Sequence, residues 1–366
     1  GHDNDSMQLY VNGGTRLTIN SSGNATFAGI VTATTFVPTT GQLSHRNLIM
    51  NGQFMIWQRA TDSGSNTTDG YLTADRWFHA SSGATKQVTR QAFTPGQTDV
   101  PDNPKYYLRY AVTTGNNNVA IRHRIEDVTR VQGEMTFSFW VKGSNPGGGA
   151  FNLTFRQNFG TGGSPSNIVD QGISDYTVTN SWTKKTFTFT PNSISGKTIG
   201  TTEGTSFYEI ELFRQPAGDT STAAFTVDFA NVQLERGPVA TPFEQRSYGE
   251  ELESCRRYFQ IIKGSSDDYT GISGYSETTS NARFPVYFRP PMRSDPTFSM
   301  SGTLRFQGGT NDSATFTSGL ALQQVNETFD GASLQLTGSS SMGAADRPGN
   351  LQFKASNSSL SFDAEL

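Results

Sequence analysis

The stretch MTFSFWVKG at residues 135–143 places Phe137, Phe139 and Val141 on one side of an extended chain and mostly polar residues on the other. Side chains alternate between the two faces of a strand, so this pattern predicts a strand that covers one side of an apolar core. The same alternation recurs in KYYLRYAV (105–112), VAIRHRIED (119–127), FNLTFRQNF (151–159), KTFTFT (185–190) and SFYEIELF (206–213). These strands, separated by glycine-rich turns rather than helices, predict a β-sandwich or jelly roll.

The composition agrees with an all-β fold. Hydrophobic residues make up 34% of the 366 residues and charged residues 16%, while 26 Phe and 12 Tyr supply aromatic side chains for a core. The net charge of −4 gives no basic surface for nucleic acid, and no apolar run reaches the roughly 18 residues of a membrane-spanning helix. The polar start GHDNDSMQLY is not typical of a signal peptide, and a single cysteine, Cys255, precludes an internal disulfide framework.

Three segments follow from these patterns: an N-terminal segment (1–43), a central jelly roll (44–248) and a β-rich C-terminal domain (249–366). In the first segment we predict short strands at 8–11, 16–19, 25–27 and 31–36. Such a segment is too short to bury a core alone, but three copies around a common axis would do so. Strand signals in the second segment begin at RNLIMNGQFMIWQRA (46–60) and end at TPFEQRS (241–247).

A short charged helix is predicted at residues 249–259, between the two large β segments. Glutamates precede arginines in YGEELESCRRYF, which suits the helix dipole, and Leu252, Cys255 and Phe259 form an apolar stripe. Cys255 is therefore expected to be a buried structural thiol. In the preceding strand we place Val232 and Leu234 in the core on the same side as Asp228, because all three positions are even.

The segment LYVNGGTRLTINSSGNATFAGIVTATTF (9–36) resembles the shaft-end repeats of bacteriophage tail fibres of the marine and cyanobacterial type. Four further motifs, NLIMNGQFMIWQR (47–59), YLTADRWFH (71–79), GEMTFSFWVKG (133–143) and DFANVQLERGPVATPFEQRS (228–247), resemble in order a jelly-roll domain of these fibres. That domain is similar in fold to carbohydrate-binding modules. The helix, PVYFRPPMRSDPTFS (285–299) and DAEL (363–366) resemble the head domain that follows it, for which we expect a β-sandwich.

The resemblance implies a homotrimer that is assembled in the host cytoplasm and located in the virion. It implies attachment to a host surface polysaccharide of lipopolysaccharide or capsule type, and contact with other tail or baseplate proteins through the N-terminus. Nucleic acid binding and membrane insertion are not expected. Related modules hold a structural calcium ion, but Met55 and Phe229 replace acidic residues common there. We therefore predict neither a metal nor a cofactor.

No catalytic motif stands out, so we do not expect an enzyme. The four histidines lack metal-ligand spacing, and PNSISGKT (191–198) lacks both the first glycine and the helix of a phosphate-binding loop. Glu209 and Glu211 are an acidic pair on one strand, for which solvated surface acids are the expectation. A glycan depolymerase and a purely structural virion component remain the alternatives to an adhesin.

Aromatic and basic residues off the predicted core face are the candidate binding residues: Trp140, Tyr107, Arg109 and Arg122. Sugar rings stack on exposed aromatic faces, but subunit interfaces are enriched in the same residue types, and we favour the interface for this set. The segment GSSDDYTGISGYSETTSNA (264–282) is predicted to be a long polar recognition loop. It contributes Tyr269 and Tyr275 as further candidate ligand-binding residues.

Overall fold

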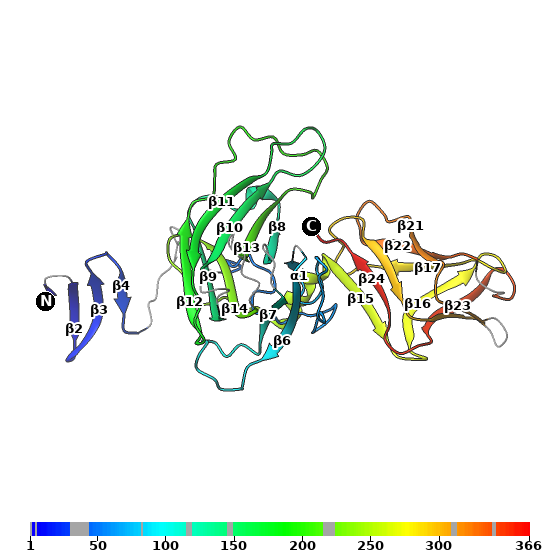
Figure 1. Ribbon diagram of the computed structural model, residues 1–366, viewed down its shortest axis with the longest axis horizontal. Coiled ribbons are helices and arrows are strands. Elements are labelled where there is room, and N and C mark those ends of the chain that lie inside the picture. The colour runs from blue at the N-terminus through cyan, green and yellow to red at the C-terminus, as the bar shows by residue number, and fades with distance from the viewer. Residues whose placement is uncertain are drawn as a thin grey trace. The chain divides into compact units, whose positions relative to one another are not determined.

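The computed structural model describes residues 2–3, 6–29, 44–81, 83–114, 119–144, 149–214, 224–308, 313–338 and 342–366. The chain divides into two compact units, Gly1–Leu43 and Ser44–Leu366. Both units are built almost entirely from antiparallel strands (Figure 1). The prediction of an all-β fold is confirmed.

The first unit is a four-stranded sheet with the order β1-β2-β3-β4. Its strands are β1 (His2–Asp3), β2 (Ser6–Val11), β3 (Gly14–Asn20) and β4 (Ala25–Phe27). The last three coincide with predicted strands, whereas the strand predicted at 31–36 lies outside the described residues. Five large apolar side chains of this small sheet are more than half exposed: Met7, Leu9, Tyr10, Val11 and Phe27. Among the described residues of this unit, the sheet therefore has no buried core of its own.

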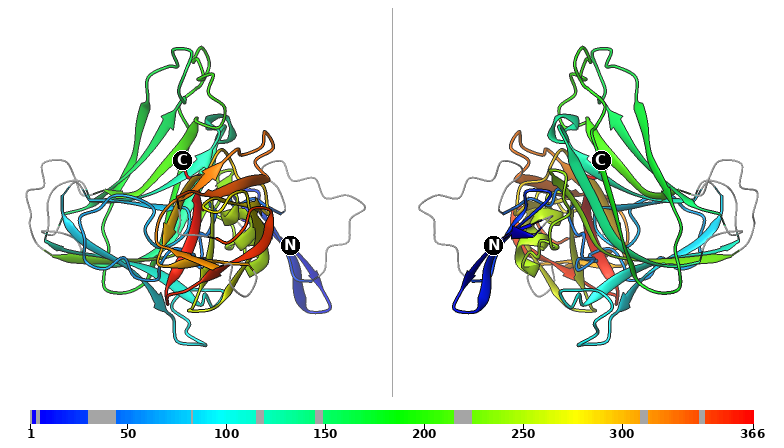
Figure 2. Two further views of the ribbon diagram at one scale, coloured as in Figure 1. Left: turned by 90° about the vertical axis from the view of Figure 1, so that its right-hand side faces the viewer. Right: turned by 90° about the vertical axis from the view of Figure 1, so that its left-hand side faces the viewer.

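The second unit begins with a sandwich of two five-stranded sheets (Figures 1 and 2). Sheet 1 has the order β12-β9-β14-β7-β6 and sheet 2 the order β11-β10-β13-β8-β5. Sheet 1 consists of β6 (Thr85–Ala92), β7 (Tyr106–Thr114), β9 (Met135–Gly143), β12 (Thr183–Phe189) and β14 (Phe225–Arg236). Sheet 2 consists of β5 (Trp77–Ala80), β8 (Ala120–Glu126), β10 (Phe151–Asn158), β11 (Val169–Tyr176) and β13 (Phe207–Arg214), and a short 3₁₀ helix, η1 (Val128–Arg130), follows β8. The predicted alternating strands are thus present.

Aromatic residues from both sheets fill the space between them. Phe213 of sheet 2 stacks on Phe229 of sheet 1 with ring centroids 5.7 Å apart, and Phe137 meets Phe155 edge to face at 5.4 Å. All four side chains are fully buried. This interdigitation explains how a chain of low overall hydrophobicity builds a large core.

The segment 46–60 contains no strand, contrary to the strand signal in its sequence. The Asn51 side chain organises it instead, accepting a hydrogen bond from the Ile56 amide (2.9 Å) and donating to the carbonyl oxygens of Ile56 (2.8 Å) and Asp75 (3.0 Å). Asn51 and Phe54 both have positive φ, of 54° and 55°. Local side-chain bonds of this kind compete with strand pairing and impose turns.

An irregularity in β14 changes which face of the strand carries Asp228. The pairing of β14 with β9 shifts register between Ala230 and Gln233, and Asn231 there has φ 47°. This bulge reverses the side-chain alternation, so Asp228 lies on the outer face while Val232 and Leu234 lie in the core. The prediction that all three share one side is therefore wrong.

The helix α1 (Tyr248–Arg256) follows the first sandwich and overlaps the predicted range 249–259. Its N-terminus is fixed by a capping box between Ser247 and Glu250, and Cys255 is fully buried, as predicted. Among the described residues, no helix is long and apolar enough to cross a membrane.

The rest of the chain forms a second sandwich with its own core. A three-stranded sheet, β15-β24-β18, consists of β15 (Phe259–Gly264), β18 (Thr297–Ser301) and β24 (Ser358–Asp363). A seven-stranded sheet has the order β20-β19-β23-β16-β17-β22-β21. Its strands are β16 (Tyr269–Ser276), β17 (Ala282–Tyr287), β19 (Leu304–Gln307), β20 (Ser313–Phe316), β21 (Leu320–Gln323), β22 (Gly331–Leu336) and β23 (Arg347–Phe353).

Two predictions about this region have different outcomes. The β-sandwich is confirmed, with Phe284, Phe306 and Phe362 among the buried residues between its sheets. The prediction of a recognition loop at 264–282 is wrong, because β16 occupies the centre of this segment and the residues of β16 alternate between exposed and buried. The two sandwiches belong to the same compact unit, so the domain boundary after residue 248 stays a prediction.

Candidate functional site

The outer face of sheet 1, opposite its core face, gathers three of the predicted binding residues. Trp140 of β9 and Tyr107 and Arg109 of β7 all lie on this face, because each alternates with a core residue of its strand. Strand β14 lies between these two strands and contributes Asp228. The sheet thus joins residues that are 33 positions apart in the sequence between Tyr107 and Trp140.

Asp228 is held at the centre of this face by two cations. Nε and Nη2 of Arg109 donate to its two carboxylate oxygens, each at 2.8 Å, and Nζ of Lys142 lies 3.8 Å away. Asp228 is buried, and its hydrogen bond raises the pKa of Arg109. Arg109 therefore neutralises a buried acid of its own chain and is committed to that role.

Tyr107 lies beneath a small aromatic cluster. Its ring centroid is 4.8 Å from that of Phe93 and 5.4 Å from that of Trp182, and Val100 from the loop between β6 and β7 is buried beside it. Only 9% of Tyr107 is exposed, and burial raises the pKa of its hydroxyl. The same chain covers Tyr107, so we assign it to support this face rather than to contact a ligand or a neighbouring subunit.

Trp140 packs against this cluster and also lines a pocket of about 470 Å³. Ser138 and Lys184 lie beside it on the sheet, and Asp102 comes from the loop between β6 and β7. Within the described part of the chain, the side chains of Ser138, Lys184 and Asp102 form no hydrogen bond or salt bridge with the protein. A hydroxyl, an ammonium and a carboxylate thus lie around an indole ring, and all three groups are available to form hydrogen bonds with a ligand.

Two buried polar residues position the walls of this pocket. Asn231, at the bulge, donates from Nδ2 to the Pro101 carbonyl oxygen (3.3 Å) and so ties the loop that carries Asp102 to the sheet. Glu235 accepts from the amide and hydroxyl of Thr241, at 2.8 and 2.6 Å, and holds the segment after β14 against the opposite wall. The pocket is therefore built from a rigid sheet and two anchored segments.

Arg122 lies on the outer face of sheet 2, away from the other predicted residues. It pairs with Glu211 (2.7 Å) and, at 3.9 Å, with Glu209, which also pairs with Arg124 (2.7 Å) and Arg156 (3.1 Å). Both glutamates are almost fully buried, so the prediction of solvated surface acids is wrong. Long arginine side chains from neighbouring strands cover the two carboxylates and keep them in ion pairs.

Tyr269 and Tyr275 lie on the exposed face of the seven-stranded sheet in the second sandwich. Strand β17 adds Tyr287, the most exposed large hydrophobic side chain among the described residues, which our sequence reasoning did not select. These tyrosines form a surface distinct from the Trp140 pocket. The sequence analysis also missed Trp182 and Asp102, whose loops reach the outer face of sheet 1 only in the folded chain.

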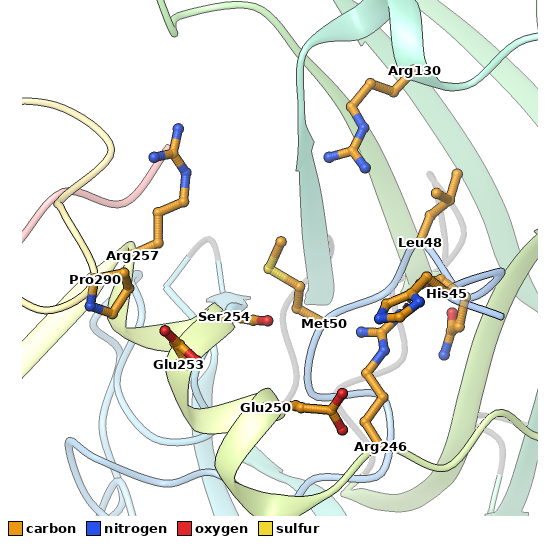
Figure 3. A pocket seen from close by; sticks show the side chains of 11 residues that line it. His45, Leu48, Met50, Arg130, Arg246, Glu250, Glu253, Ser254, Arg257 and Pro290 are labelled. Carbon is orange, nitrogen blue, oxygen red and sulfur yellow. Dashed lines mark hydrogen bonds between the residues drawn. The ribbon is translucent and has the colours of Figure 1, made fainter.

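A second pocket, of about 440 Å³, lies where α1 meets the first sandwich (Figure 3). Arg130, Arg246 and Arg257 enter it from different elements, and Glu253 points in from α1 (Figure 3). Burial lowers the pKa of Arg257, but its bond to Glu126 (3.0 Å) and the other nearby charges together raise that pKa above its ordinary value. Among the described residues, no Trp, Tyr or Phe lines this pocket, and much of its charge is used in contacts within the chain.

No group of three or more His, Cys, Asp or Glu side chains is arranged to hold a metal ion in the described ranges. Asp228, the remaining acid of the calcium-associated motif, is engaged by Arg109 and Lys142. The expectation of a protein without metal or cofactor stays a prediction.

Comparison with known proteins finds a family match over part of the first sandwich. Residues 89–204, which include β7, β9 and β12 of sheet 1, match the sequence profile of a family described as "Carbohydrate binding domain". The chain therefore carries a match to a carbohydrate-binding domain over about a third of its length. No curated protein matches the chain.

The solved structures that match this chain include carbohydrate-binding modules and a phage protein. The xylan-binding domain CBM22-1 from Paenibacillus barcinonensis is 16% identical with a TM-score of 0.26, covering 49% of this chain and 94% of that domain. Carbohydrate-binding modules of the β-sandwich superfamily are 14% identical with a TM-score of 0.29, covering 60% and 71%. The enzymatically active domain of tailspike protein 4 from bacteriophage CBA120 is 13% identical with a TM-score of 0.30, covering 52% of this chain. The match spans only 21% of that tailspike chain.

Proposed function

We propose that this protein binds a glycan through the Trp140 pocket on the outer face of sheet 1. One observation carries the proposal: an indole ring lines a pocket together with Ser138, Lys184 and Asp102, whose polar groups have no partner within the described chain. The apolar face of a sugar ring stacks on an aromatic side chain, while its hydroxyl groups need hydrogen-bond partners around the rim. The match of residues 89–204 to a carbohydrate-binding domain supports the same assignment.

The biological role that we propose is attachment of a phage tail fibre to a host surface polysaccharide of lipopolysaccharide or capsule type. The resemblance of residues 9–36 and of the four jelly-roll motifs to tail-fibre sequences supports this role. The protein would then belong to the virion, joined to other tail or baseplate proteins through its N-terminal unit. Binding without cleavage is part of the proposal, because Glu209 and Glu211 are held in ion pairs.

We also propose that the chain forms a homotrimer through its N-terminal unit. Apolar side chains such as Leu9, Tyr10 and Phe27 are more than half exposed on a sheet that has no core. Packing copies around a common axis would remove these side chains from water, and three chains would give avidity to weak individual sites. Light scattering is expected to give three chain masses for the full chain and one for a chain lacking residues 1–43; a single-chain mass for the full chain would refute the trimer.

The binding proposal is tested with a glycan array and with adsorption to host cells. Trp140→Ala is expected to weaken binding about tenfold or more, since a lost aromatic contact of about 1.5 kcal/mol corresponds to roughly that factor. Tyr287→Ala serves as the matched control, because it removes an exposed aromatic ring from the other sandwich. Unchanged binding by Trp140→Ala together with a loss in Tyr287→Ala would move the site to the second sandwich and refute the assignment.

The absence of catalysis is tested on the same glycans. Incubation of the protein with a polysaccharide that it binds is expected to release no new reducing ends. Their appearance at a rate that depends on protein concentration would instead support a depolymerase.

A further inference from the structure

A smaller pocket of about 260 Å³ lies at the edge of the first sandwich, separate from the Trp140 pocket. Trp57, Tyr106 and Tyr248 line it together with Arg90 and Lys105. These residues come from the irregular segment 46–60, from β6, from β7 and the loop residue directly before it, and from the start of α1. Tyr106 and Tyr107 are successive residues of β7, so their side chains lie on opposite faces of sheet 1.

The two cations of this pocket have no acidic partner within the part of the chain that the structure describes. Among the described residues, neither Arg90 nor Lys105 forms a salt bridge or a side-chain hydrogen bond, and no residue that lines the pocket is acidic. This sets them apart from Arg109 and Arg122, which are both paired with buried carboxylates. Two positive charges that line one pocket without a counter-charge repel each other and favour binding of an anion there.

Aromatic contacts hold these cations in place. The Arg90 guanidinium carbon lies 4.4 Å from the centroid of the Tyr106 ring, and Nζ of Lys105 lies 5.2 Å from it. The Arg90 amide donates to the Thr61 carbonyl oxygen at 2.8 Å, which fixes the backbone at this point. A guanidinium that stacks on a ring keeps its N–H groups free to bind an oxyanion. Because the stacking already orders the arginine side chain, less side-chain entropy is lost when a ligand binds.

The other two aromatic walls are also positioned by the fold. The Trp57 indole nitrogen donates to the Phe54 carbonyl oxygen at 2.6 Å, and its ring packs against the main core. Tyr248 is the first residue of α1, directly after the Ser247 cap, yet 60% of it is exposed. An exposed tyrosine on a fixed helix end gives a sugar ring a surface to stack on.

We infer that this pocket binds a negatively charged sugar residue, with Arg90 and Lys105 on the anionic group and Tyr248 or Trp57 against the sugar ring. The ligand class is thus an acidic polysaccharide, whose charge comes from a carboxylate or from a sulfate ester. The Trp140 pocket has one ammonium and one carboxylate, Lys184 and Asp102, and offers no such excess of positive charge. The full chain would therefore bind a surface glycan at two sites, one for a sugar ring at the Trp140 pocket and one for an anionic sugar at this pocket.

Titration calorimetry with defined oligosaccharides tests the inference. The probes are a galacturonate tetrasaccharide, the same tetrasaccharide with its carboxylates methyl-esterified, and a sulfated galactan tetrasaccharide. We expect the full chain to bind the acid at least about tenfold more tightly than the ester, a difference of about 1.4 kcal/mol. The affinity for the acid is expected to fall as salt concentration rises, because the partly exposed charges are screened.

Variants assign the binding to this pocket. Arg90→Gln and Tyr248→Ala are each expected to weaken binding of the anionic probe about tenfold. Arg347→Gln, which removes the same charge from the exposed start of β23 in the second sandwich, is expected to leave binding unchanged. Circular dichroism and thermal unfolding confirm that each variant is folded; Tyr248, being exposed, is the variant least able to disturb the core.

Each outcome decides the inference. Arg90-dependent binding of the sulfated probe, or of the acid in preference to its ester, supports it and identifies the source of the charge. No binding of either anionic probe, full binding by Arg90→Gln, or equal affinity for acid and ester without Arg90-dependent binding of the sulfated probe overturns it. Trp140→Ala is expected to keep its affinity for the anionic probe, so loss of host adsorption in that variant and loss of anion binding in Arg90→Gln are separable results.

Discussion

Replacing Glu365 with glutamine is expected to destabilise the second unit by about 3 kcal/mol, because it leaves a buried arginine without its counter-charge. The Glu365 carboxylate bonds to Arg76 of the first sandwich, where 1% of the Arg76 side chain and 5% of the Glu365 side chain are exposed. Burial lowers the pKa of Arg76, but the surrounding charges, Glu365 first among them, together raise it above its ordinary value. An arginine guanidinium is not deprotonated in proteins, so Arg76 remains charged both in the wild type and in the Glu365→Gln variant.

The magnitude follows from what remains after the substitution. Breaking a buried ion pair by removing one partner costs about 3–5 kcal/mol. Arg76 keeps a hydrogen bond to the Arg124 carbonyl oxygen (2.6 Å) and a position 3.5 Å from the centroid of the Tyr258 ring. The amide of glutamine also retains an acceptor oxygen, so we take the lower end of that range. With a urea m-value of about 3 kcal/mol/M, the midpoint is expected to fall by about 1 M.

Urea unfolding followed by tryptophan fluorescence measures this effect. All four tryptophans, at positions 57, 77, 140 and 182, lie in the first sandwich, so their signal reports how strongly the C-terminal residues stabilise that sandwich. Glu253→Gln is the matched control, since Glu253 is exposed on α1 and forms no ion pair with a described residue, and is expected to stay within about 0.5 kcal/mol of the wild type. A midpoint shift below about 0.2 M for Glu365→Gln would refute the reasoning.

Burial lowers the pKa of His79 to about 3, so the unfolded state binds more protons than the folded state between pH 3 and 6.5, and the free energy of unfolding should fall as pH falls through that window. At pH 5 the loss from this residue is about 2 kcal/mol, which lowers the urea midpoint. The midpoint of His79→Gln should depend less on pH. Burial also raises the pKa of the Cys255 thiol, so a thiol reagent should label it only after unfolding, and rapid labelling of the native chain would contradict its placement in the core. Gly274→Ala should destabilise the second sandwich by about 2 kcal/mol or more, because an added Cβ would lie 1.9 Å from the Arg283 carbonyl oxygen, whereas Gly172→Ala meets no atom within 4 Å and should be nearly neutral in thermal unfolding.

The sequence by itself determined the class of fold and most of the strands. Alternation of apolar and polar residues is a local property, and burial of one strand face follows from it wherever the strand pairs, as it does for Phe137 and Phe139. The buried Cys255 and the helix that carries it were predictable for the same reason. The alternation of apolar and polar residues predicted strands wrongly where side-chain hydrogen bonds determine the backbone conformation, as those of Asn51 do in the segment 46–60.

The candidate site depended on tertiary structure. The bulge at Asn231 placed Asp228 on the outer face beside Arg109, against the parity read from the sequence. A loop and Trp182 covered Tyr107 while leaving Trp140 in a pocket, although both were predicted to be equivalent. Side-chain alternation specifies which residues share a face of one strand, but only the pairing of distant strands and the path of their loops decide which of those residues remain open to a ligand.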